Sequence, residues 1–478
     1  DATHALHAYQ QEPSPKEDLA KIPLLKREDM KKEAAAYVNE ERGSKEAPVL
    51  YHNIFTNGIG YLNLVFDASH VPARLFPYIG ILKSIFTLMV DTEHYSYSDL
   101  YNEIRIHTGG TKMVFNVYTN AKDMTKVKPT FEARTKFLFN QKDKAVELLE
   151  EILIHADFSD TKRLYEILAE YKSDMQATMQ SAGHSLAAIR AMSYFSKSAA
   201  VTEQVNGIPQ YRLLEELTKN FEDRKEKLVA NLKELCKYLF RPENLLLDYT
   251  APEGYAGIEE AVDRLRKNLY TDEIVKETYE PVTEKKNEGF LTAGQVQYVC
   301  RAGNFIREGL PYTGALRVLK VMMGYDYLWN QVRVVGGAYG CMCSFGRNGD
   351  AYFVSYRDPN LEKTIRTYEQ AADYITGCRL DEREVTQFII GAVSELDTPM
   401  TPAVKGIYSL GGYMTGLSVE RLQKERDELL AVTPEIIQGL GRQVAAFMKQ
   451  DYICVVGNGN KLKESKELFM NMEQLFRS

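Results

Sequence analysis

The order of predicted secondary-structure elements occurs twice along this chain of 478 residues. In each copy a strand is followed by helical periodicity, a pair of glycines, two further strands and more helices. The glycine pairs are Gly109-Gly110 and Gly336-Gly337, which lie 227 residues apart, the size of one large domain. The chain is therefore predicted to contain two copies of one α/β plan.

Each copy also carries a turn signal between strand-like runs. In the first copy, VLYHNIF and GYLNLVF flank Asn57-Gly58, which predicts a tight hairpin. In the second, GRNGD predicts a hairpin between strands at 338–345 and 351–356. The other predicted elements of the two copies are helices at 73–89, 98–107 and along 142–240, strands near 112–119 and 131–139, a strand at QVQYVCRA, and helices at 313–332, 360–377 and 381–396.

Polar and charged stretches place the domain boundaries. Residues 1–47 are rich in Lys and Glu and contain prolines, which predicts the end of a linker. A similar polar stretch predicts a connector at 271–290. The two α/β repeats are accordingly predicted at 48–270 and 291–478.

Composition excludes several classes of function. Hydrophobic residues at 44% and charged residues at 26% are typical of a globular protein with a large core. With 59 basic and 66 acidic residues the net charge is −7, which gives no basic field for nucleic acid. No apolar run is long enough to span a membrane. Six scattered cysteines favour a reducing, cytoplasmic location, although an organellar origin stays open because the sequence begins with Asp1 and not with Met.

Catalytic motifs are absent from the sequence, including H-E-x-x-H, H-x-x-E-H, G-x-S-x-G and the phosphate-binding P-loop. His4 and His7 lie in a polar segment without a suitably spaced Glu, which indicates solvated linker residues. The segment Val90 to His94 keeps the Glu-His pair of H-x-x-E-H but has Val90 where the first ligand would be. We therefore predict no metal site in this chain and expect Glu93 and His94 to have ordinary structural roles.

Several longer runs resemble one family of peptidases. HNIFTNGIGYLNLVFDASHVP and EHYSYSDLYNEIRIHTGG resemble the third domain of presequence proteases, and LWNQVRVVGGAYGCMCSFGRNGDAYFVSYRDPN resembles their fourth domain. IPLLKREDM resembles the end of the segment that joins the two halves of these proteins. The resemblance extends from about Leu19 to the C-terminus and indicates the pitrilysin/insulinase superfamily of zinc peptidases, presequence-protease branch.

This resemblance implies a fold and a function. The family has four homologous α/β domains, each a mostly antiparallel sheet packed against helices. They pair into two halves that close around an unstructured peptide, and only the first domain holds the zinc. The chain would then be the substrate-binding C-terminal half, inactive alone and without zinc of its own. Its partners would be the zinc-carrying N-terminal half of the same polypeptide and peptide substrates, with no nucleic acid and no membrane.

The resemblance also implies two site residues. The family's last domain has an Arg and a Tyr that reach toward the substrate, and these match Arg333 and Tyr339. A tyrosine hydroxyl can donate a hydrogen bond to an oxyanion, and a guanidinium can hold substrate carbonyls. The glycines around them would allow close approach of the substrate backbone at Gly336, Gly337, Ala338 and Gly340.

The residues themselves leave other interpretations open. Tyr339 could simply pack its strand, and Arg333 could be a solvated cation at a helix end. The first repeat has Arg105 but places Lys112 where Tyr339 would fall, so only the second copy has the pair.

Other hypotheses address the whole chain. It could be a naturally separate, non-catalytic subunit or interaction protein of the same fold, or a peptidase with an unrecognised site. The isolated half could also self-associate through the surface that its partner should cover. The reading frame upstream of Asp1 would distinguish the C-terminal half of a longer peptidase from a naturally separate subunit.

Overall fold

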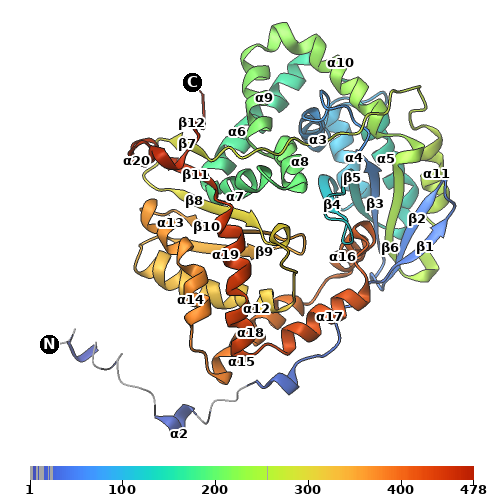
Figure 1. Ribbon diagram of the computed structural model, residues 1–478. Coiled ribbons are helices and arrows are strands. Elements are labelled where there is room, and N and C mark those ends of the chain that lie inside the picture. The colour runs from blue at the N-terminus through green and yellow to red at the C-terminus, as the bar shows by residue number, and fades with distance from the viewer. Residues whose placement is uncertain are drawn as a thin grey trace.

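The computed structural model describes residues 25–255 and 257–477, and before them only 4–6, 9, 15–19 and 21. Two six-stranded sheets lie side by side, each with helices packed against it (Figure 1). Within these described ranges no helix is both long enough and apolar enough to cross a membrane.

Sheet 1 belongs to the first repeat and has the strand order β1-β2-β6-β3-β5-β4. Neighbouring strands are antiparallel except for β2 and β6. Its strands are β1 (Glu40–Gly43), β2 (Pro48–Asn53), β3 (Ile59–Asp67), β4 (Thr111–Thr119), β5 (Val127–Leu138) and β6 (Leu245–Ala251).

Sheet 2 repeats this order as β12-β7-β11-β8-β10-β9, so β7 to β11 correspond to β2 to β6. Here β7 is parallel to both β11 and β12, and the remaining pairs are antiparallel. The prediction of two mostly antiparallel repeats is confirmed. The strands are β7 (Glu288–Thr292), β8 (Tyr298–Asn304), β9 (Gly340–Phe345), β10 (Asp350–Tyr356), β11 (Tyr452–Asn458) and β12 (Asn471–Gln474).

The prediction of a hairpin at Asn57-Gly58 is wrong about strand pairing, because β2 and β3 do not pair with each other. Both residues have positive φ, at 53° and 91°, so the chain does reverse at the predicted turn. However, β6 inserts between β2 and β3 and pairs with both of them. Turn chemistry fixes the reversal, whereas burial of β6 in the centre of the sheet decides the pairing. The GRNGD hairpin is confirmed, because β9 and β10 pair directly across it.

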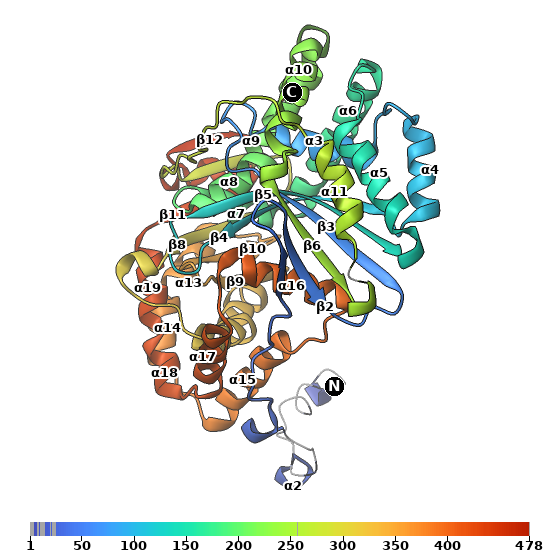
Figure 2. The ribbon, with the colours of Figure 1, turned by 90° about the vertical axis from the view of Figure 1, so that its right-hand side faces the viewer.

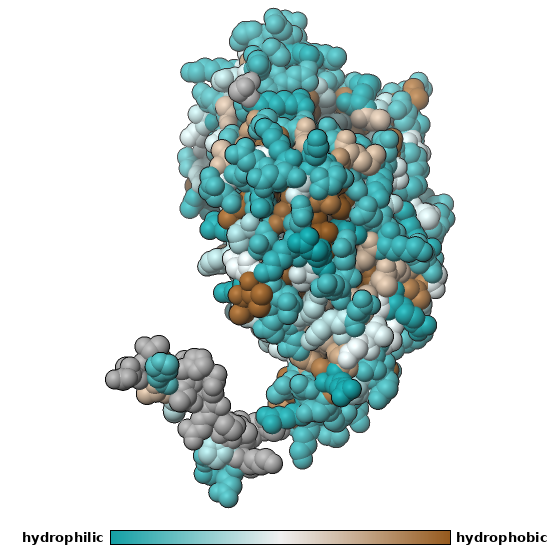
Figure 3. All heavy atoms as spheres, turned by 60° about the vertical axis from the view of Figure 1, so that its left-hand side comes forward, coloured by the Kyte–Doolittle hydropathy of each residue, from teal (hydrophilic) through white to brown (hydrophobic). Residues whose placement is uncertain are grey.

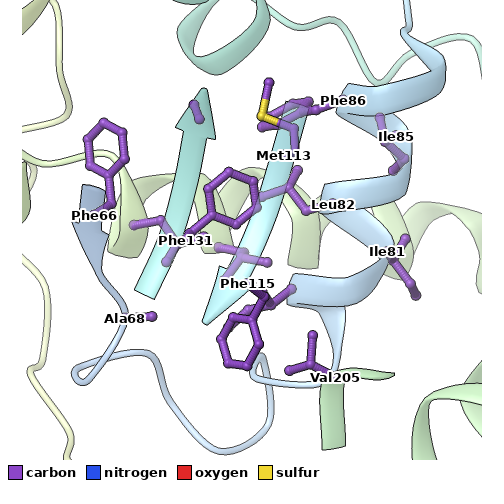
Figure 4. Close-up of a cluster of buried hydrophobic side chains, with 14 of the residues drawn as sticks. Phe66, Ala68, Ile81, Leu82, Ile85, Phe86, Met113, Phe115, Phe131 and Val205 are labelled. Carbon is purple, nitrogen blue, oxygen red and sulfur yellow. The ribbon is translucent and has the colours of Figure 1, made fainter. Parts of the chain in front are cut away.

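Helices of the first repeat other than α7 form a layer over one face of sheet 1 (Figure 2). At the sheet's centre Phe131 meets Phe86 of α3 and Phe240 edge-on, with ring centroids 6.2 and 5.5 Å apart (Figure 4). Burial of each such side chain stabilises the fold by about 1.5–3 kcal/mol. The α-helices that precede the second repeat are α2 (Lys16–Leu19), α3 (Tyr78–Leu88), α4 (Tyr97–His107), α5 (Lys142–Ile154), α6 (Thr161–Ser181), α7 (Gly183–Ser193), α8 (Lys197–Asn206), α9 (Ile208–Lys219), α10 (Phe221–Leu239) and α11 (Glu259–Lys267).

The second repeat has its own helical layer. The single helix predicted at 313–332 is α-helical only in α12 (Ala315–Met322) and continues as two π-helical segments, η6 (Met323–Tyr327) and η7 (Trp329–Val334). The later helices are α13 (Glu362–Glu369), α14 (Ala371–Gly377), α15 (Glu382–Leu396), α16 (Pro402–Thr415), α17 (Val419–Leu430), α18 (Pro434–Gly439), α19 (Gly441–Lys449) and α20 (Gly459–Glu464).

Segments predicted as linkers contribute strands to the sheets. The predicted linker at 1–47 contains β1, which pairs with β2 at the edge of sheet 1. The predicted connector at 271–290 contains the first residues of β7. Polar sequences such as the EERG of β1 suit an edge strand, because only one of its sides is covered.

Each repeat donates a helix to the other repeat's sheet. Helix α7 of the first repeat packs against β8, β10 and β11 of sheet 2, and α16 of the second repeat packs against β2, β4 and β6 of sheet 1 (Figure 1). Thr401 caps the first turn of α16 and Gly416, in the left-handed conformation, ends it. Leu410 of α16 is buried between Leu50 and Val65 of sheet 1.

A buried ion network also joins the two repeats. Arg190 of α7 donates to Glu288 of β7 at 2.7 Å and to Glu203 of α8 at 2.9 Å. Tyr194 donates to Glu288 at 2.9 Å. Burial raises the pKa of Glu203, although Arg190 opposes this shift. One cation therefore holds two buried carboxylates at the junction.

Gly406 lets α16 approach sheet 1 closely. A Cβ at this position would lie 2.1 Å from Oγ1 of Thr250, so the helix or the strand would have to move. We expect Gly406→Ala to destabilise the protein by about 1–3 kcal/mol, measured by thermal or urea unfolding. Gly411→Ala is the matched control, because a Cβ there meets open space and alanine favours the helix. Equal stability of the two variants would contradict this close packing.

Candidate functional site

Arg333 lies in the π-helical segment η7, Tyr339 follows the turn after it, and the two side chains contact each other. Cζ of Arg333 is 4.0 Å from the ring centroid of Trp329 and 5.7 Å from that of Tyr339. The guanidinium thus contacts two aromatic rings, and such cation–π contacts fix its orientation. Tyr339 is 65% exposed and Trp329 40%. Both rings therefore present surface to solvent beside a fixed cation.

Trp329 was not predicted as a site residue. It is the only tryptophan of the chain and lies four residues before Arg333. Residues four apart share a helical face, so this spacing was a usable signal. The π-helical geometry of η7 is itself frequent at functional sites.

The predicted glycines have different roles in the turn between Arg333 and Tyr339. Gly337 has φ of +81°, and a Cβ on Gly336 would lie 2.3 Å from the carbonyl oxygen of Val332, so the turn requires both glycines. Gly340 opens β9 with no close neighbour. Ala338 is 4% exposed, and its side chain packs in the core. The structure therefore brings Gly336 and Gly337 to the site and turns the Ala338 side chain away from it.

The end of β10 holds this turn in place. The backbone amide of Tyr339 donates to the carbonyl of Tyr356 at 3.0 Å, and the side-chain amide of Asn360 donates to the carbonyl of Gly336 at 2.6 Å. The Asp358 side chain is fully buried and accepts a hydrogen bond from the backbone amide of Asn360 at 2.8 Å. Burial raises the pKa of Asp358. Hydrogen bonds with the SYRDPN segment, residues 355–360, therefore hold the turn that leads to Tyr339.

Exposed apolar side chains surround the pair. Tyr325, Val334 and Val335 are 72%, 64% and 61% exposed. Clusters of large apolar side chains with such high exposure are uncommon on protein surfaces. Figure 3 shows one face of the molecule, on which apolar side chains form small groups within a mostly hydrophilic surface. The site therefore combines one cation, a phenol and an apolar surround.

The segment that resembles a zinc motif is not built as one. Val90 is buried, and the segment lies in a loop after α3. His94 contacts Glu151 at 2.6 Å through Nδ1, and His155 contacts Glu93 at 3.0 Å. Glu93 and His94 thus form hydrogen bonds with the end of α5. No group of three or more His, Cys, Asp or Glu among the described residues is arranged to hold a metal. The residues present do not fit zinc.

Comparison with known proteins places this architecture in a class. The crystal structure of the peptidase M16 inactive domain from Pseudomonas fluorescens matches 88% of this chain and 98% of its own, with a TM-score of 0.61 at 13% identity. This chain therefore shares the fold of that domain.

Sequence comparison finds related families and proteins. The model for the domain associated with subfamily C of the M16 peptidases matches residues 1–217, and "PreP C-terminal domain" matches residues 287–453. Protein HypA of Clostridium perfringens is 37% identical over all of this chain, and presequence protease 1 (chloroplastic/mitochondrial) of Arabidopsis thaliana is 27% identical over 90%. The chain spans about half of these relatives, 49% and 40% of their lengths. Over its whole length the chain is therefore similar to the C-terminal half of M16 (pitrilysin-family) peptidases, among them the presequence proteases.

Proposed function

We propose that this chain is the substrate-binding half of a zinc metalloendopeptidase that degrades unstructured peptides in a closed chamber. The zinc-carrying N-terminal half of the same polypeptide would be its partner. The observation that carries the proposal is the exposed arrangement of Arg333 between Trp329 and Tyr339. This chain contributes substrate contacts, and its partner contributes the metal.

Each side chain has a role that its geometry supports. The Arg333 guanidinium lies against the Trp329 ring and donates no hydrogen bond to a described residue, so its N–H groups are free to donate to peptide carbonyls. The Tyr339 hydroxyl has no hydrogen bond to any described residue. It is therefore free to donate to the oxyanion that develops during peptide hydrolysis. The turn at Gly336 and Gly337 would let the substrate backbone approach.

The chain alone tests the division of roles. We expect the purified 478-residue chain to bind unstructured peptides, to contain far less than one zinc per molecule and to cleave no peptide. The measurements are elemental analysis for zinc, fluorescence anisotropy with a labelled peptide, and a fluorogenic cleavage assay. One tightly bound zinc per chain together with peptidase activity would overturn the proposal.

A further inference from the structure

Three cationic side chains share one end of sheet 1, on the face opposite its helical layer. Lys112 of β4 and Arg134 of β5 stand directly opposite each other in the strand register. Lys136 follows two residues after Arg134, so it points to the same side of the sheet. The three side chains line a cavity of about 490 Å³ between the sheet and the start of α16.

Of these three cations, Arg134 is neutralised by a carboxylate, that of Glu132. It donates to Glu132 at 2.6 Å, and hydrogen bonds from Asn63 and Asn116 complete this buried carboxylate. Burial alone would raise the pKa of Glu132, but Arg134 and these donors outweigh it and lower the pKa. Glu132 therefore stays ionised and committed to Arg134.

Lys112 and Lys136 make no ion pair with any described residue. Asp248, the carboxylate that lines the cavity, is buried and contacts His52 at 2.6 Å. Because Glu132 neutralises Arg134, Lys112 and Lys136 are the cations of this group that lack a counterion among the described residues. A bound anion would supply one.

The remaining wall shows which anion would fit. Gly109 leaves room for the stem of Lys136, because a Cβ there would lie 2.5 Å from Cε of that lysine. Tyr61 and Ile407 add apolar surface. Thr401 at the start of α16 also lines the cavity, and the positive end of a helix dipole favours negative charge. The cavity suits an anion attached to an apolar group.

We propose that this cavity binds a carboxylate of the peptide substrate, held by Lys112 and Lys136, with the adjoining residue against Tyr61 and Ile407. The inference rests on the proposed function and names the substrate chemistry. The carboxylate could be the peptide's C-terminus or an Asp or Glu side chain. The repeat supports a role in substrate binding. When the two glycine pairs are aligned, Lys112 falls at the sequence position of Tyr339, and the strand β4 that carries Lys112 corresponds to β9, which Tyr339 directly precedes.

The test uses one unstructured labelled peptide in three forms: a free C-terminus, a C-terminal amide, and the amide with one internal Glu. Binding to the 478-residue chain is measured by fluorescence anisotropy at low and high salt. We expect amidation to weaken binding about tenfold at low salt, and less at high salt because salt screens exposed charges. If the internal Glu restores binding, the cavity takes side-chain carboxylates. If it does not, the cavity selects the C-terminus.

The variant Lys112→Met with Lys136→Met should bind the free-carboxylate peptide no better than the amide. Its affinity for the amide should be unchanged, and its unfolding temperature equal or higher, because no ion pair with a described residue is lost. Lys122→Met removes one lysine from the loop beyond the other end of β4; as the control for loss of a lysine outside the cavity, it should bind all forms as the unchanged chain does.

Three outcomes would overturn the inference in distinguishable ways. Equal binding of amide and free-carboxylate peptides by the unchanged chain rejects the carboxylate subsite and leaves the proposed function standing. Binding of inorganic phosphate to these lysines, without any effect of the peptide carboxylate, identifies a free-anion site. No binding of any peptide form rejects both the subsite and the peptide-binding part of the proposed function.

Discussion

Replacement of Tyr339 by phenylalanine should lower kcat about ten- to a thousandfold in the enzyme formed when this chain is joined to a zinc-carrying half. The hydroxyl lies on an exposed ring beside Arg333 and has no described hydrogen-bond partner, so its loss removes a donor without disturbing packing. If the hydroxyl acts only in the transition state, kcat falls and KM stays nearly constant. Steady-state hydrolysis of a fluorogenic peptide measures both constants.

The control for this prediction is Tyr325→Phe. Tyr325 is also an exposed tyrosine, 72% accessible, and it lies on η6 near the same site. Its hydroxyl has no assigned role, so turnover should stay within about twofold of the unchanged enzyme. Unchanged turnover in Tyr339→Phe itself would assign that ring to packing alone.

Arg190→Met should have the largest effect on stability. The substitution leaves Glu203 and Glu288 buried without their cation, and removal of one partner from a buried ion pair costs about 3–5 kcal/mol. We expect this loss in the free energy of unfolding, measured with urea. In contrast, Arg224→Met removes a half-exposed pair with Glu216 and should cost less than about 1 kcal/mol.

The pH dependence gives an independent check on Arg190. Burial already raises the pKa of Glu203, and loss of the cation would raise it further. A carboxyl with a folded pKa above its unfolded value of about 4.3 loses stability as pH rises past that unfolded value. The deficit of Arg190→Met should therefore be larger at pH 8 than at pH 5. A deficit that does not change with pH would indicate lost packing instead of unpaired carboxylates.

The repeated plan could be predicted because its signals are local. Strand and helix periods, glycine pairs and turn residues recur in each copy, and the structure places β4 and β9 at equivalent edges. The insertion of β6 between β2 and β3 could not be predicted in this way. Almost the whole first repeat separates β6 in sequence from the Asn57-Gly58 turn. The residues of that turn therefore carry no information that β6 will pair with the strands on either side of it.

The candidate site and the cavity also contain residues that could be predicted from the sequence and residues that could not. Arg333, Tyr339 and the glycines were found from a resemblance, whereas Trp329 needed only helical spacing and was overlooked. The cavity cations come from separate strands, and only the strand register shows that Lys112 faces Arg134. Alternation along each strand gives the face of a side chain, but not which strand lies beside it.

The exchange of helices α7 and α16 means that neither repeat is a separable folding unit. A protein cut within the predicted connector at 271–290 would leave sheet 1 without α16 and sheet 2 without α7. Leu50 and Val65, now buried under Leu410, would meet water, and the first fragment would tend to aggregate. Duplication of one plan thus produced an interlocked pair, and truncation studies or domain transplants must move both repeats together.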